Sequence, residues 1–94
     1  MARLIRMDGT ESDITPKGTR FTLREFYALI GNGCDIVEML ALPGRRTMWL
    51  DEEGKFRRLR VNDKATLLGR KAGIALWDMV VGNVVVTESG ECPT

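Results

Sequence analysis

The sequence predicts a single α+β domain, in which a mixed or mainly antiparallel sheet of four or five strands carries two helices packed on one face. Three observations support this fold class. The chain has 94 residues, which is the length of one domain. Residues 21–31 and 63–72 combine helical spacing with capping residues, whereas the stretches between and around them show strand and turn chemistry. We expect the domain to cover residues 1–88 and a flexible tail to cover residues 89–94.

The N-terminal stretch is expected to form two short strands. Residues 2–7 make the first strand, and residues 8–10, with the sequence Asp-Gly-Thr, are typical of a turn. Residues 11–17 form either a short edge strand or an extended loop, because Pro16 lacks the N–H group that a central strand uses.

Residues 21–31 contain the clearest helix signal in the chain. Thr22 and Glu25 have the spacing of a capping box, and Phe21 and Phe26 stand at the positions of a hydrophobic staple. The Gly-Asn-Gly sequence that follows ends the helix, because it supplies a residue that accepts positive φ. The aromatic stripe of this helix is interpreted as core packing.

Residues 35–42 are expected to form a central strand covered on both sides, because both faces of the strand are mostly apolar. Glu38 is the exception. Its carboxylate either lies at the solvent side of a partly covered face or is paired within a site. A turn at residues 43–45 joins this strand to residues 46–51, and together they form a β-hairpin.

The hairpin leads through an acidic turn to the second helix. In the turn at residues 51–55, Gly54 suits the left-handed position of a type I turn with a bulge. Residues 56–61 add a short strand or an irregular crossing segment. Asn62 is a good N-cap for a helix at residues 63–72.

The last part of the chain contains the end of this helix and a final strand. Gly73 is the expected stop of the helix. Residues 74–81 are apolar and form either a turn of helix or a strand. Residues 84–87 are a β-branched run, which predicts a buried last strand.

The composition excludes several classes of protein. The net charge is +1, so the molecule as a whole is neither a basic nucleic-acid binder nor an acidic mimic of DNA. The chain has no histidine and two cysteines, so one chain cannot complete a tetrahedral zinc site. Free thiols in a reducing cytoplasm are favoured for Cys34 and Cys92, and a disulfide between them stays open as the alternative. No metal and no cofactor are expected.

The location of the protein is inferred from the absence of targeting sequences. No apolar run approaches the ~20 residues of a membrane span. The first six residues lack the long apolar core of a signal peptide. We therefore expect a cytoplasmic protein that does not associate with a membrane.

Positive charge gathers between residues 55 and 71, where Asp63 is the single acid. Arginine forks hold phosphate in bidentate geometry, and the start of a helix adds free N–H groups. This stretch could therefore bind a phosphorylated ligand. The candidate binding residues are Lys55, Arg57, Arg58, Arg60, Asn62 and Lys64. The alternative is a solvated face that balances the acids of the adjoining turn.

Three further features carry candidate chemistry. The acidic turn at residues 51–53 could bind a divalent cation, although an exposed turn is favoured because the acids lack the spacing of a calcium loop. Glu38 could form a carboxylate pair for acid–base work with Glu52 or Glu53, but nothing in the sequence brings them together. Trp77 is the expected exposed aromatic residue and a candidate anchor for a partner.

Short sequence matches to one family occur in a fixed order along the chain. They are Leu50–Lys55, Leu59, Asn62, Ala65, Thr66, Asp78, the Val81-Gly82 step and the valine-rich last strand, with Leu29–Gly31 and Ile36–Glu38 before them. In these residues, over positions 3–88, the chain resembles a domain-of-unknown-function family, DUF3846, of phages, bacteria and archaea. The resemblance implies a small stand-alone protein of phages or mobile elements, with no established enzymatic activity and no catalytic residues. The chain departs from the family pattern at residues 57–60 and 69–71.

These inferences favour a non-enzymatic binding protein of a phage or mobile element. We expect a counter-defence inhibitor that either binds a host defence protein or sequesters a phosphorylated nucleotide signal as an oligomeric sponge. The alternative is a nucleic-acid-associated accessory module that uses the basic face at residues 55–71. A homodimer or higher oligomer is expected, because a domain of this size gains stability from self-association.

Overall fold

A computed structural model of the protein describes residues 2–91. In this part of the chain, five strands form one antiparallel sheet and two helices pack against it. The elements in chain order are β1 (Ala2–Ile5), β2 (Glu11–Ile14), α1 (Leu23–Ile30), β3 (Val37–Leu42), β4 (Arg46–Asp51), α2 (Asp63–Lys71) and β5 (Val84–Glu88). A single α+β domain with an antiparallel sheet is therefore confirmed.

The last strand of the chain lies at the centre of the sheet. The strand order is β2-β1-β5-β4-β3, and every pairing is antiparallel. Val85 of β5 lies opposite Leu4 of β1 on one side and opposite Trp49 of β4 on the other. The residues from Val84 to Thr87 are all buried, which confirms the predicted buried last strand.

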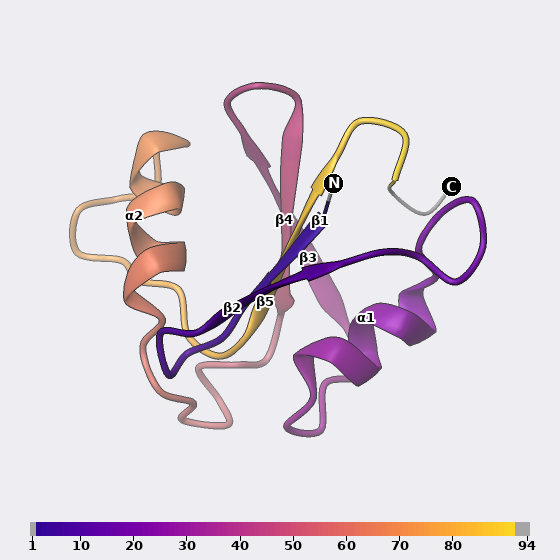
Figure 1. Ribbon diagram of the computed structural model, residues 1–94. Helices are drawn as coiled ribbons and strands as arrows, with labels where there is room; N and C mark the ends of the chain where they lie inside the picture. Colours follow the sequence, from indigo (N-terminus) through magenta and orange to yellow (C-terminus); the bar gives the residue numbers. More distant parts are fainter. Residues whose placement is uncertain (1, 92–94) are drawn as a thin grey trace.

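The two helices lie on opposite faces of this sheet (Figure 1). Val85 packs in the core under α1, whereas Val84 and Val86 pack in the core under α2. In the same way, β4 directs Trp49 toward α1 and Met48 toward α2. The prediction that both helices share one face is wrong. The central strands are apolar on both sides, and each side needs its own cover.

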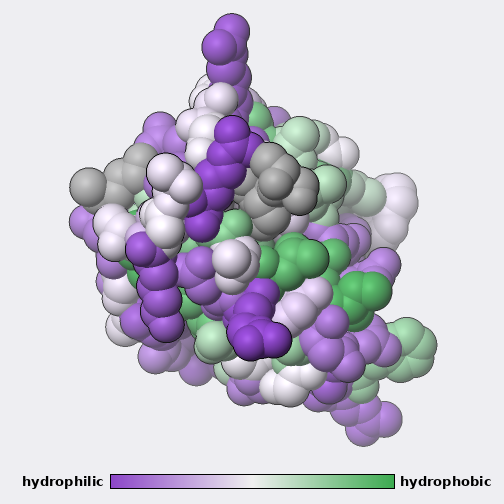
Figure 2. All heavy atoms as spheres, turned by 90° about the vertical axis from the view of Figure 1, so that its right-hand side faces the viewer, coloured by the Kyte–Doolittle hydropathy of each residue, from purple (hydrophilic) through white to green (hydrophobic). Residues whose placement is uncertain are grey.

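The predicted structure of α1 is confirmed. Thr22 and Glu25 form a capping box, in which each side chain accepts a hydrogen bond from the backbone N–H of the other residue. The ring of Phe21 lies 5.3 Å from that of Phe26, which in turn lies 4.7 Å from the ring of Trp49. The aromatic stripe is therefore core. Seen from the α1 side, apolar side chains reach the surface in patches between hydrophilic ones (Figure 2).

β3 is an edge strand and not the central strand that its apolar composition predicts. Among residues 2–91 it pairs with β4 alone, and in it Met39 is 66% exposed while Leu42 is buried. The prediction is wrong because β5 comes from the far end of the chain and takes the central place beside β4. Apolar composition gives no information on such long-range strand order. At the opposite edge, β2 is a short edge strand, which is one of the two structures expected for residues 11–17.

The segments on either side of α2 are irregular. Residues 56–61 form turns and coil, and Val61 makes an isolated bridge with Val81 in place of a strand. Residues 74–80 likewise contain no helical turn and no strand, so both structures predicted for this stretch are wrong. The two segments instead pair with each other, since Asn62 N–H donates to Val80 O at 2.8 Å.

Gly54 is needed for a reason other than its predicted left-handed conformation. A Cβ atom at this position would lie 3.0 Å from Val81 Cγ2 and 3.3 Å from the carbonyl oxygen of Asp51. The left-handed residue of the segment is Arg58, with φ of 54°. The close approach of residue 81 therefore requires glycine at position 54, and the predicted bulge is wrong.

Asn62 joins three parts of the chain through one buried amide. It is 1% exposed, and its Oδ1 accepts a hydrogen bond from Ala65 N at 3.1 Å, which confirms the predicted N-cap of α2. Its Nδ2 donates to Ile5 O at 3.0 Å and to Gly82 O at 2.9 Å. The end of β1, the start of α2 and the turn before β5 thus meet at one side chain.

The sequence predicts free thiols at both cysteines, and the structure describes one of them, Cys34. Cys34 is buried, and its Sγ lies 3.6 Å from the carbonyl oxygen of Ile36. Burial is the main reason that its pKa is raised, which makes it a poor nucleophile. Cys92, and with it the alternative disulfide, lies outside the described residues, as does the rest of the expected tail from residue 92 onward.

Replacing Asn62 with alanine should lower the free energy of unfolding by about 3 kcal/mol, because two buried carbonyls and one helix N–H lose their partner. Asn62→Ser is the comparison, since a serine oxygen still caps a helix but does not donate to both carbonyls. Urea denaturation followed by circular dichroism measures the three proteins. The serine variant should lie between the other two. Equal stability of wild type and Asn62→Ala would contradict this role of the amide.

Candidate functional site

Arg57, the first arginine of the predicted cluster, is engaged by three carboxylates. Its Nε donates to Asp51 Oδ2 at 3.0 Å. Its Nη2 lies 3.3 Å from Asp35 Oδ1 and 3.5 Å from Glu53 Oε1. The side chain of Asp51 is 1% exposed, so this ion pair compensates a buried charge. Arg57 therefore holds the acidic turn in place, and its guanidinium fork is not free for a phosphate.

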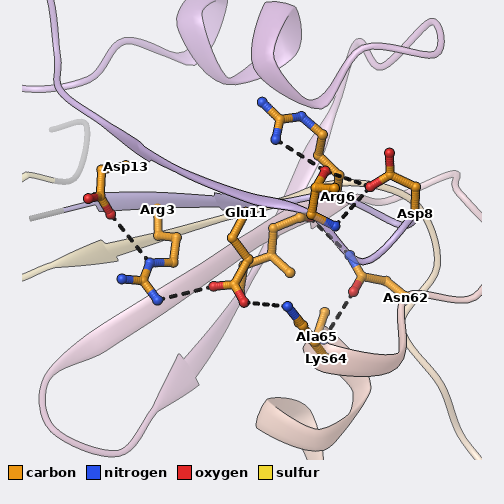
Figure 3. Close-up of polar contacts among 10 residues, drawn as sticks. Arg3, Arg6, Asp8, Glu11, Asp13, Asn62, Lys64 and Ala65 are labelled. Atoms are coloured by element: carbon orange, nitrogen blue, oxygen red, sulfur yellow. Dashed lines mark hydrogen bonds and ion pairs between the residues drawn. The ribbon is translucent and has the colours of Figure 1, made fainter.

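The N-terminus of α2 is closed by side chains of the protein itself (Figure 3). Asn62 Oδ1 takes the N–H of Ala65, and Lys64 Nζ lies 2.8 Å from Glu11 Oε2. Arg3 binds the other oxygen of the same glutamate at 3.1 Å. The predicted cradle of arginine forks, asparagine and helix start is therefore not assembled at this helix.

Arg58 and Arg60 remain exposed, and within residues 2–91 neither forms an ion pair. Arg60 lies close enough to Asp8 to affect its titration. Hydrogen bonds from Thr10 are the main cause of the lowered pKa of Asp8, and the charges of Arg6 and Arg60 add to it. Anion binding by these two arginines stays a prediction.

Lys55 and Trp77 lie on two segments that one ion pair joins. The ammonium group of Lys55 contacts the carboxylate of Asp78, and this hydrogen bond is the main cause of the lowered pKa of Asp78. Trp77 is 86% exposed and its neighbour Leu76 is 81% exposed. Trp77 is therefore the exposed aromatic residue that the sequence predicts, while its role as a partner anchor stays a prediction.

The outer edge of β3 presents backbone groups that pair with no strand in the part of the chain that the structure describes. Ile36 O accepts a hydrogen bond from Glu52 N at 3.1 Å, in line with the register in which Val37 lies opposite Asp51. In an antiparallel pair, hydrogen-bonded and non-hydrogen-bonded residues alternate. The N–H and C=O groups of the other set therefore point outward from the sheet. These belong to Val37, Met39 and Ala41.

Exposed apolar side chains and two hollows border this edge. A hollow of about 380 Å³ lies on the α2 side, and its walls include Met39, Leu40 and Met79. A second hollow has Ile36 and Phe56 in its lining, and Glu52 contributes to both. Phe56 is 89% exposed, so its ring does not pack into the hydrophobic core. We call this region, formed by β3 and these hollows, the β3 edge surface.

The hollow on the α2 side is acidic. Partial burial of its carboxyl group is the main cause of the raised pKa of Glu38, although the residue as a whole is exposed. The nearby charges of Glu52 and Asp78 raise this pKa further, while Lys55 opposes them. Lys55 is already bonded to Asp78. Within residues 2–91, Glu38 and Glu52 form no ion pair. Two carboxylates without an ion-pair partner among the described residues therefore lie beside the open strand.

The sequence offers Glu38 and Glu52 as a candidate carboxylate pair, and the structure places their charges close enough to interact. A signal for this proximity exists in the sequence, although it is not a motif. A three-residue turn at 43–45 sets Leu42 opposite Arg46, and counting back along both strands sets Ile36 opposite Glu52. Glu38 is then a diagonal cross-strand neighbour of Glu52, a separation over which long side chains interact. The hairpin register, and not a motif, brings the two acids together.

No group of three or more acidic or cysteine side chains within residues 2–91 is arranged to hold a metal ion. Neither helix combines the length and apolar composition that crossing a bilayer requires.

Comparisons with known proteins identify a family but no activity. Residues 3–93 match the model of a family described as "Domain of unknown function (DUF3846)". The resemblance noted in the sequence is thereby confirmed. Searches of curated proteins and of solved structures gave no significant match.

Arg57→Ala should lower the free energy of unfolding by about 2 kcal/mol, because the buried Asp51 carboxylate loses its counter-charge. Arg58→Ala is the matched control, since Arg58 makes no ion pair in the described chain. Chemical denaturation of both variants measures the difference. If the two variants are equally stable, the ion pairs of Arg57 do not contribute to the stability of the fold.

Glu38→Gln should raise the melting temperature at pH 7. A raised pKa means that the folded state favours protonated Glu38, so its contribution to stability is present below the ordinary pKa of glutamate and is lost as the pH rises. The gain should vanish below about pH 4, where the glutamate is protonated in both states. Thermal unfolding of the wild type and the variant in buffers from pH 3.5 to pH 8 tests this expectation. A gain that persists at the acidic end would exclude titration of Glu38 as its cause.

Proposed function

The chain belongs to the DUF3846 family, and we propose that it is a non-enzymatic binding protein that pairs its β3 edge with an extended segment of a partner protein. The observation that carries this proposal is the six-residue edge of β3, with outward backbone groups at three of its residues. An open edge is a template onto which a further strand adds by main-chain hydrogen bonds.

The two edges of the sheet differ in a way that supports this choice. β2 is four residues long, and its Glu11 and Asp13 side chains are held in ion pairs by Arg3. Short length and charged side chains are the features by which natural sheets protect an edge. β3 is longer, contains one charged residue, Glu38, and exposes Met39. Of the two edges, β3 is the one open to a partner.

Side chains around the strand add apolar contact area. Ile36 and Met79 are each more than two-fifths exposed, and Phe56 is almost fully exposed. Methionine and aromatic residues are enriched in protein–protein interfaces. Trp77 lies next to Asp78, which lines the same hollow, and is a further candidate contact.

The partner class follows from the setting that the family resemblance implies. In a phage or mobile element, a small protein of this kind acts on a host protein in the cytoplasm, and we propose a defence protein as the target. Sequestration of a phosphorylated nucleotide has less support, because Arg57 and Asn62 are already bonded to other groups of the protein. The nucleic-acid alternative is weakened in the same way, because Lys55 and Lys64 are bound to acids.

Amide hydrogen exchange tests the open edge. In the free protein, the amides of Met39 and Ala41 should exchange much faster than those of Glu38 and Leu40, which pair with β4. A seven-residue peptide of alternating threonine and valine should slow the outward amides. Met39→Pro should abolish this protection, because proline removes an outward N–H and is tolerated on an edge strand.

Three outcomes would overturn the proposal. First, the outward amides of β3 could be protected from hydrogen exchange in the free protein, with protection that increases with protein concentration. This result would show that the edge pairs with a second copy of the chain. Absence of protection by any strand-forming peptide would remove the edge as a binding site. A rise in melting temperature with added nucleotides would instead support sequestration, since a ligand that binds the folded state stabilises it.

A further inference from the structure

We propose that the segment bound by the β3 edge is basic, with a lysine or arginine side chain that enters the acidic hollow between Glu38 and Glu52. This inference rests on the proposed function, because it requires a strand added along β3. It goes further by assigning the chemistry of the partner.

The charges in the hollow select a cation. Glu38 and Glu52 form no ion pair within residues 2–91, and the ammonium of Lys55 is held by Asp78. Asp51 also lines the hollow, but its carboxylate is bonded to an arginine outside it. The two unpaired carboxylates repel each other, so a cation placed between them gains from both.

The geometry of strand addition brings a side chain to this place. Glu38 and Leu40 project from β3 on the α2 side, and both line the hollow. Residues on the same face of an added strand would lie about 5 Å from them. A lysine or arginine there can extend its charged end toward the carboxylates, while its aliphatic stem packs on Leu40, Leu50 and Met79.

A second copy of the protein does not supply this cation. The sequence of β3 is VEMLAL, which contains no lysine and no arginine. Antiparallel pairing of β3 with β3 of another copy would leave Glu38 beside apolar residues or beside another Glu38. Both carboxylates would then stay unpaired in a less hydrated site, which is unfavourable. A basic segment of a different protein fits the surface better.

Fluorescence anisotropy of the full chain with three labelled peptides tests the inference. The probes are seven-residue peptides of alternating threonine and valine, in which the central residue is lysine, glutamine or glutamate. At low salt the lysine peptide should bind about tenfold more tightly than the glutamine peptide, and the glutamate peptide more weakly than both. Glu38→Gln and Glu52→Gln should each weaken the lysine peptide about fivefold and leave the glutamine peptide unchanged.

Asp13→Asn on β2 is the matched control, because it removes the same charge at the opposite edge of the sheet. An equal loss of lysine-peptide binding in this variant would overturn the inference, since it would show attraction to the overall charge. Equal binding of all three peptides, with the β3 amides protected, would overturn the basic partner and leave the edge function standing. If no peptide binds, both proposals fall.

Discussion

The buried amide of Asn62 is the interaction on which the arrangement of the elements depends. This buried side chain caps α2 through its oxygen, and its nitrogen donates to the carbonyl of Ile5, which ends β1, and to that of Gly82, which precedes β5. Because each of these groups is buried or nearly so, leaving any of them unpaired would cost the desolvation energy of a polar group. The amide therefore fixes where α2 begins relative to the two neighbouring strands at the centre of the sheet.

Several residues that carry the family resemblance lie in the two segments that flank α2. Gly54 admits Val81 to close contact, Lys55 binds Asp78, and Asn62 bonds the carbonyl of Gly82. Each of these contacts closes the segment after β4 against the segment before β5. These motif residues thus have a structural role, because they hold the segment after β4 against the segment before β5.

The same closure determines the surface that is left open. With β5 inserted beside β4, β3 is displaced to the edge of the sheet, and its hairpin register sets Glu38 diagonally across from Glu52. The segment before β5 then forms one wall of the hollow that contains both acids. The contacts that join these two segments and the candidate binding surface at β3 are therefore formed by the same part of the structure. The arginines at residues 57–60 contribute less to a binding surface than the sequence predicts, because Arg57 is bonded to Asp51 of the acidic turn.

The sequence by itself determined the local features of this protein. The capping box of Thr22, the N-cap of Asn62, the hairpin and the buried last strand depend on hydrogen bonds and side-chain patterns within a few residues. Only the tertiary structure decided the strand order, the opposite faces of the helices, the ion pairs of Arg57 and the open edge of β3. These depend on contacts between distant segments, and the alternation of apolar residues shows that a face is buried without showing what buries it.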